Sequence, residues 1–239
     1  MKQIQKAVPP KAIIRYMNQP GLTWGGCKVK PEVRSALYKE QFGLCAYCLS
    51  TLNPPTAIPH PAPIDGGMKI EHWKARNEAG ISAAEQHKRS FDWMNLLGVC
   101  PGGVKRRPAN GVRLKIHSEL YCDAFRDTSL LARNPADPSQ PVEHLFTLSS
   151  TGELSVCDSL NNIDRLDADG LLTKLNLNAP ALVELRAAAL KAVVPIHPSA
   201  NRSVSDVLNE LSQPDSQGAL PAFCTLIQDF LDRSFPRGP

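Results

Sequence analysis

The sequence lacks the features that direct a chain into or across a membrane. No apolar run approaches the roughly 20 residues that a membrane-spanning helix needs, and the amino-terminal residues contain no apolar core long enough for a signal peptide. Cysteine is also scarce, with seven in 239 residues, and the number is odd, so the cysteines cannot all be paired within one chain. This usage argues against a disulfide-rich secreted scaffold. We therefore expect a cytoplasmic protein with no membrane-embedded part.

Two functional signatures are missing as well. The chain contains no Gly-x-x-x-x-Gly-Lys-Ser/Thr loop, so any ATP hydrolysis linked to it must come from another chain. It has one Cys-x-x-Cys pair, Cys45 and Cys48, but no thioredoxin-like βαβ pattern around it. A redox function for this pair is therefore the weakest of the interpretations considered.

The Cys-x-x-Cys pair is instead typical of half of a tetrahedral zinc site. No second pair with this spacing exists to complete it. Either the cysteines are unlinked buried residues, which are common as small hydrophobic side chains, or the second pair has been split. The remaining cysteines are Cys27, Cys100, Cys122, Cys157 and Cys224.

Positive charge gathers in one segment, residues 101–121. It holds five basic residues against Glu119 alone, a balance of +4 that equals the formal net charge of the whole chain. Such a segment can contact phosphates or can be a solvated loop, and both interpretations remain open. Its basic residues are Lys105, Arg106, Arg107, Arg113 and Lys115.

The pattern of breaks divides the chain into three parts. Proline and glycine interrupt residues 1–30 too often for a long helix, so we expect an amino-terminal arm there. Residues 31–135 form the second part, and a proline cluster separates it from a mostly helical third part, 136–239. The fold class expected is α+β.

Individual elements follow from local signals. Ser82 and Glu85 have the spacing of a helix amino-terminal cap. Short strands are predicted at 68–73 and 96–100, helices at 31–42, 122–132, 179–194, 199–212 and 220–235, and a hairpin at 144–156.

Taken in order, the second part holds a Cys-x-x-Cys, a strand ending in Glu-His, an asparagine, a second strand ending in cysteine, and a helix beginning Cys-Asp. This order resembles the ββα-metal core of the HNH endonuclease superfamily. More narrowly, it resembles the HNH subunit of the Septu and retron-linked anti-phage systems. The residues that carry the resemblance are "LCAYC", "IEHW", "DWMNLLGVC", "CDAFRD", "NPADP" and "KLNLNAPALVELR", which spread from Leu44 to Arg186.

The resemblance implies that Cys100 and Cys122 are the split second pair, with the basic segment inserted between them. Cys45, Cys48, Cys100 and Cys122 would then form a closed, structural zinc site. Zinc would hold together a small motif with little core of its own.

The resemblance also implies a separate catalytic centre. His72 would be the general base, and Asn95 would orient it through a hydrogen bond. Glu71 and Asp123 would bind the catalytic Mg²⁺ or Mn²⁺, and Arg126 would contact a phosphate. In the insert, nucleic acid would be bound by Lys105, Arg106 and Arg107.

The function implied is metal-dependent hydrolysis of DNA or RNA phosphodiester bonds. Partners implied are the ATPase of the defence system and, for a retron, a reverse transcriptase with its non-coding RNA. An alternative from another class is a zinc-stabilised nucleic-acid-binding or adaptor subunit with an inactive HNH site. Asp123 favours this alternative, because the HNH pattern usually has His or Asn at that position.

Overall fold

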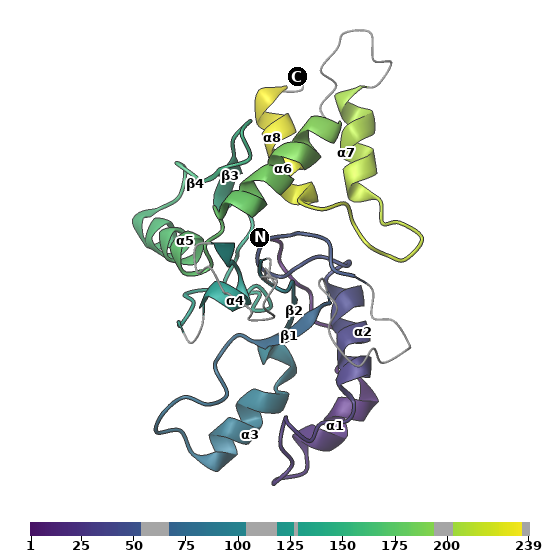
Figure 1. Ribbon diagram of the computed structural model, residues 1–239, viewed down its shortest axis with the longest axis vertical. Coiled ribbons are helices and arrows are strands. Elements are labelled where there is room, and N and C mark those ends of the chain that lie inside the picture. The colour runs from purple at the N-terminus through teal and green to yellow at the C-terminus, as the bar shows by residue number, and fades with distance from the viewer. Residues whose placement is uncertain (54–66, 104–118, 127–128, 194–202, 236–239) are drawn as a thin grey trace, which may run out of the picture.

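The computed structural model describes residues 1–53, 67–103, 119–126, 129–193 and 203–235. Within them the fold is mixed α+β, as expected, with helices around two small antiparallel sheets (Figure 1). The sheets are β1–β2 and β3–β4. The elements are α1 (Lys11–Met17), α2 (Lys30–Glu40), β1 (Lys69–His72), α3 (Ala83–Phe91), a 3₁₀ turn (Trp93–Asn95), β2 (Leu96–Val99), α4 (Asp123–Arg126), β3 (Phe146–Leu148), β4 (Leu154–Val156), α5 (Asn162–Lys174), α6 (Pro180–Val193), α7 (Val204–Ser212) and α8 (Cys224–Ser234).

The β1–β2 sheet lies near the middle of the molecule, between the lower helices α1–α3 and the upper helices α6–α8 (Figure 1). Its register places Glu71 opposite Leu97 and His72 opposite Leu96. The buried amide of Gln41 fixes this sheet to the end of α2. Its Nε2 donates to the Gly98 carbonyl at 2.7 Å, and its Oε1 accepts from the Gly98 N–H at 2.7 Å.

Gly98 is required by this close approach. A Cβ atom added there would lie 2.3 Å from the Met68 side chain and 3.2 Å from the Gln41 amide. Any larger residue would therefore displace the Met68 side chain and crowd the Gln41 amide that joins β2 to α2.

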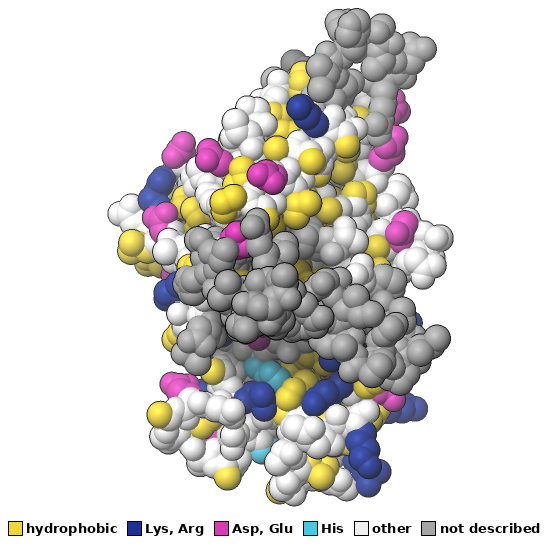
Figure 2. All heavy atoms as spheres, in the orientation of Figure 1, with side chains coloured by type: hydrophobic (Ala, Val, Ile, Leu, Met, Phe, Trp, Pro, Cys, Tyr) yellow, Lys and Arg dark blue, Asp and Glu magenta, His cyan; other side chains and the backbone are white. Residues whose placement is uncertain are grey.

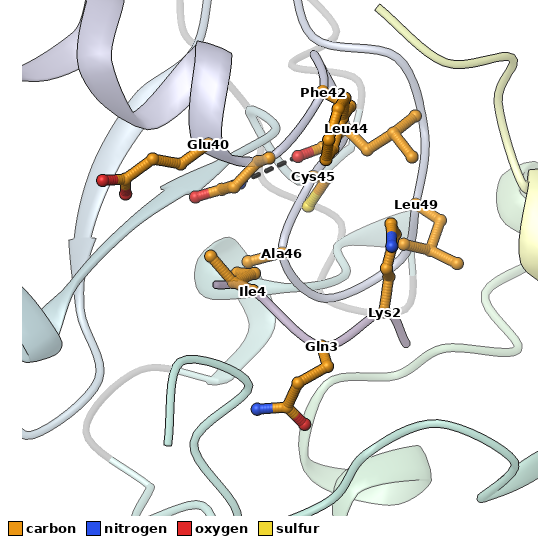
Figure 3. Close-up of a pocket in the computed structure, with 10 residues that line it drawn as sticks. Lys2, Gln3, Ile4, Glu40, Phe42, Leu44, Cys45, Ala46 and Leu49 are labelled. Atoms are coloured by element: carbon orange, nitrogen blue, oxygen red, sulfur yellow. Dashed lines mark hydrogen bonds between the residues drawn. The ribbon is translucent and has the colours of Figure 1, made fainter. Parts of the chain in front are cut away.

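Part of the expected amino-terminal arm is buried in the body of the protein. Met1 and Ile4 are each 5% exposed, and the Ile4 N–H donates to the Pro135 carbonyl at 2.8 Å. Ile4, Ala46 and Cys45 line the same cavity of about 10 Å³ (Figure 3). The first residues therefore pack against the cysteine loop rather than extending from the body.

The three expected parts share one hydrophobic core that runs from Met1 to Leu231. The carboxy-terminal half reaches the cysteine loop directly, since the Leu220 N–H donates to Phe42 and the Phe223 N–H donates to Leu49, both at 2.9 Å. Packing of this half therefore supports the cysteine region.

Most predicted elements are confirmed. Ser82 caps α3 by accepting a hydrogen bond from the Glu85 N–H at 3.2 Å, and the hairpin forms as β3–β4. The helix expected at 122–132 is shorter, because α4 ends at Arg126. In the described part of the chain, no helix has both the length and the apolar character needed to cross a bilayer.

Candidate metal centre and the acidic pair beside it

Four cysteines from three separate segments converge at one buried point. The Sγ atoms of Cys45 and Cys122 are 4.0 Å apart, and those of Cys48 and Cys100 are 3.8 Å apart. All four ligand atoms lie within 4.8 Å of one another. Because Zn–S bonds of about 2.3 Å in a tetrahedron separate sulfurs by about 3.8 Å, this cluster can hold a metal ion such as zinc.

Local backbone geometry brings the sulfurs together. The Leu49 N–H donates to the Cys45 carbonyl at 3.1 Å, which closes the Cys-x-x-Cys turn. The Cys100 N–H at the end of β2 donates to Cys45 Sγ at 3.3 Å. Cys122 has a left-handed φ of 54°, and its N–H donates to Leu175 at 2.8 Å.

The chemistry of the cluster also suits a cation. Burial and hydrogen bonds from the neighbouring thiols raise the pKa of Cys122 well above its usual range. Four buried sulfurs cannot all ionise without a compensating charge. A divalent cation supplies that charge, so the thiolates and the metal would stabilise one another.

The backbone segments that flank the basic insert, next to Cys100 and next to Cys122, contact each other. The Tyr121 N–H donates to the Gly102 carbonyl at 3.1 Å, and a Cβ on Gly102 would lie 2.3 Å from the Tyr121 carbonyl. The predicted contacts Lys105, Arg106 and Arg107 lie outside the described residues.

A pair of carboxylates lies beside the cysteine cluster. Glu71 projects from β1 and Asp123 opens α4, directly after Cys122. Burial, a hydrogen bond with Asp123 and the charge of Asp123 raise the pKa of Glu71 to about 8, although Arg126 opposes this rise. In the absence of a cation the pair therefore favours sharing a proton, and a divalent ion could replace that proton.

Other charges hold this pair in place. Lys69 Nζ lies 3.3 Å from Asp123 Oδ2, and Arg126 Nη1 lies 2.8 Å from Glu71 Oε1. Arg126 also donates to the hydroxyl of Tyr47 at 2.8 Å. Because Tyr47 lies inside the Cys-x-x-Cys turn, it links the metal centre to the acidic pair.

Arg126 was expected to contact phosphate, and the structure corrects this expectation. Its side chain is 2% exposed. All three guanidinium nitrogens donate hydrogen bonds inside the protein, to Tyr47, Glu71, Ser129 and the Trp73 carbonyl. Arg126 therefore positions Glu71 from within.

His72 lies at the end of β1 and is only 8% exposed. Its Nε2 lies 3.1 Å from the Ser90 carbonyl. A carbonyl can only accept, so Nε2 carries the proton and Nδ1 keeps its lone pair. The ring also packs edge-on against Trp24, with centroids 4.7 Å apart. Sequence reasoning identified neither Ser90 nor Trp24.

Burial is the main reason that the pKa of His72 falls to about 4. The charges of Arg76 and Lys30 lower it further, while Ser90 and Asp123 raise it. His72 is therefore neutral at pH 7, which is the state a general base needs.

Asn95 occupies a different place from the one expected. Its amide donates to the Arg89 carbonyl at 2.7 Å and the Lys74 carbonyl at 3.1 Å, and accepts from the Lys74 N–H at 2.7 Å. Ser90, the next residue after Arg89, makes the hydrogen bond to His72. Asn95 therefore acts on His72 indirectly, by joining the end of α3 to the end of β1.

Arg186 of α6 is fully buried and had no predicted role. Among the described residues it donates to neutral groups: the Gly152 and Leu177 carbonyls and the Asn178 amide oxygen. Burial lowers its pKa to about 10, while Cys48 and Cys122 raise it. Its charge thus partly balances the negative charge of ionised thiolates.

A larger cavity, of about 370 Å³, lies between α3 and the loop after Arg133. Asn95 lines it, so it adjoins the candidate site. Its charges balance, with three cations against three carboxylates, and it therefore offers no net attraction to a phosphate. The charged lining residues are Lys74, Lys88, Arg89, Glu85, Asp92 and Asp137.

Cys27, Cys157 and Cys224 stay outside the cluster; Cys27 and Cys224 are buried, whereas Cys157 is only partly buried. Comparison of the whole chain with protein-family models and with curated proteins gives no match.

Proposed function

We propose that this chain is a metal-dependent HNH endonuclease that hydrolyses phosphodiester bonds in nucleic acid. One observation carries the proposal: a neutral histidine whose Nδ1 keeps its lone pair ends β1, directly after a carboxylate that is paired with Asp123 of α4. β1, β2 and α4 follow the strand, strand, helix order of the ββα-metal motif.

The residues have complementary tasks. A bound Mg²⁺ or Mn²⁺ would neutralise charge at the phosphate and on the leaving oxygen, and Glu71 and Asp123 are the side chains that would hold it. His72 Nδ1 takes the proton from the attacking water. The Ser90 carbonyl fixes the ring while it does so, by accepting the Nε2–H of the imidazolium that forms.

The cysteine cluster would support this chemistry without taking part in it. Cys122 is covalently adjacent to Asp123, and Cys100 directly follows β2, the strand paired with β1. A structural zinc bound there would fix the acidic pair relative to His72. The proposal includes the wider role, in which the chain is the effector of an anti-phage complex with a separate ATPase and, in a retron, a reverse transcriptase with its RNA.

The second candidate is a zinc-stabilised binding or adaptor subunit with an inactive site. The low exposure of His72 favours it, as does an aspartate at position 123. The two candidates differ in whether the purified chain cuts nucleic acid.

His72→Asn should reduce single-turnover cleavage by about 10²- to 10⁴-fold, the usual contribution of a general base. Asparagine removes the base and keeps a planar polar side chain, but it is too short to donate to Ser90 as Nε2 does. The planar shape matters because His72 is packed edge-on against Trp24. The assay uses plasmid DNA and labelled RNA with Mg²⁺ or Mn²⁺, and circular dichroism and zinc content check the fold. Equal rates for a folded variant and wild type would remove His72 from the mechanism, and no cleavage by either would favour the adaptor.

A further inference from the structure

Charge divides the molecule into two opposite halves. The described residues 1–53 and 67–103 hold thirteen Lys and Arg against six Asp and Glu, a formal charge of +7. The described residues from 119 onward hold seven against fifteen, a formal charge of −8. Figure 2 shows the same division on one face, with acidic side chains gathered over the upper helices and basic ones over the lower helices.

This division does not depend on the basic insert, since residues 104–118 belong to neither count. A polyanion is attracted to the first half and repelled by the second. The charge pattern therefore orients nucleic acid on the folded body.

Three cations of the basic half surround the end of β1. Lys30 Nζ lies 5.5 Å from the centre of the Trp24 ring, and that ring packs on His72 at 4.7 Å. Lys74 follows two residues after His72 and is exposed, with its Nζ 5.6 Å from the Trp73 ring. Arg76 is half-buried and forms no ion pair with any described residue.

We propose that the phosphodiester backbone of nucleic acid runs over a basic track formed by Lys30, Lys74 and Arg76 at the end of β1. The acidic carboxy-terminal half then faces away from the strand. The track passes beside His72, so a phosphate held by these cations lies next to the proposed general base. This inference rests on the proposed function, because the track is expected to hold the substrate of the nuclease. Binding to the track can nevertheless be measured without cleavage.

The test compares two triple variants, both made in full-length protein carrying His72→Asn. The first removes the track, with Lys30→Ala, Lys74→Ala and Arg76→Ala. The control removes the same charge from the acidic half, with Arg165→Ala, Lys174→Ala and Lys191→Ala. Binding of labelled duplex DNA, single-stranded DNA and RNA is measured by fluorescence anisotropy over a salt series, without added divalent ions.

The track variant should bind at least about tenfold more weakly, because three phosphate contacts are lost. Its log–log salt slope should flatten by up to about 0.9 per lost contact on duplex DNA and about 0.7 on single strands. The control variant should bind like its parent. The nucleic acid that shows the largest change is the form that the track accommodates.

Three results would overturn the track: an unchanged slope in the track variant, equal losses in both variants, or no binding by the parent to any of the three nucleic acids. Each leaves the nuclease proposal to be judged by the cleavage assay. Conversely, binding through the track by a wild-type chain that never cuts would support the track and remove the nuclease.

Discussion

Cys122→Ser should leave the chain without zinc and without a stable fold. Zinc binding by a structural site contributes about 10–16 kcal/mol in isolated peptides, whereas a whole domain is stable by only about 5–15 kcal/mol. Cys122 is fully buried, and its neighbouring sulfur on Cys45 lies 4.0 Å away. Mass spectrometry of metals measures the loss of zinc, and circular dichroism with thermal unfolding measures the loss of the fold.

Cys157→Ser is the matched control. Cys157 is only partly buried and lies outside the cluster, so this variant should keep one zinc per chain and unfold like wild type. A Cys122→Ser protein that folds normally, or folded wild-type protein with no bound metal, would show that the four cysteines are ordinary packing residues.

At pH 9, above the pKa of about 8 that Glu71 has in the folded chain, Arg126→Met should lower the free energy of unfolding by roughly 3–5 kcal/mol, the usual effect of removing one partner from a buried ion pair. Glu71 is 13% exposed at its side chain and would lose its partner at 2.8 Å. Tyr47 would lose its hydrogen bond too. Denaturant unfolding monitored by circular dichroism gives the change.

Adding Glu71→Gln to Arg126→Met should recover part of the lost stability, because the uncompensated carboxylate is gone. Arg165→Met is the surface control: its ion pair with Asp158 spans 3.8 Å and is exposed, so it should change stability by less than about 1 kcal/mol. Equal effects from Arg126→Met and Arg165→Met would mean that Arg126 does not hold the acidic pair.

Local patterns and the resemblance together predicted the four-cysteine cluster, which could hold a metal ion. The spacing of Cys45 and Cys48 is typical of half of a zinc site. The resemblance added Cys100 and Cys122, and the structure brings all four cysteines together. The helix cap at Ser82 and the β3–β4 hairpin were also predicted correctly, because a cap and a tight turn depend on residues that are close in the sequence.

Long-range packing could not be predicted in the same way. Burial of Met1 and Ile4 depends on a groove built by distant segments, so proline and glycine near the start suggested a free arm instead. The contacts of Arg126 depend on Tyr47 and Glu71, which are more than 50 positions away in the sequence. A predicted helix places such a side chain on a face but does not say what covers that face.

The orientation of His72 was missed for a similar reason. A backbone carbonyl holds its ring, and any residue at position 90 has one. Residue type therefore gave no signal for Ser90. The asparagine of the motif, Asn95, was predicted to orient His72 instead. The opposed charges of the two halves are present in the sequence, but they largely cancel in the formal net charge of +4.

The central claim is that two metals have separate tasks, with zinc holding the fold and a second divalent ion supporting hydrolysis. The most direct measurement follows zinc content and cleavage of DNA and RNA in the same wild-type samples, while Mg²⁺ or Mn²⁺ is withdrawn and then restored. The account predicts that withdrawal stops cleavage reversibly while one zinc per chain and the circular dichroism spectrum stay unchanged. Cleavage that continues without added Mg²⁺ or Mn²⁺, or its absence from zinc-loaded, folded protein with either ion present, would contradict the account.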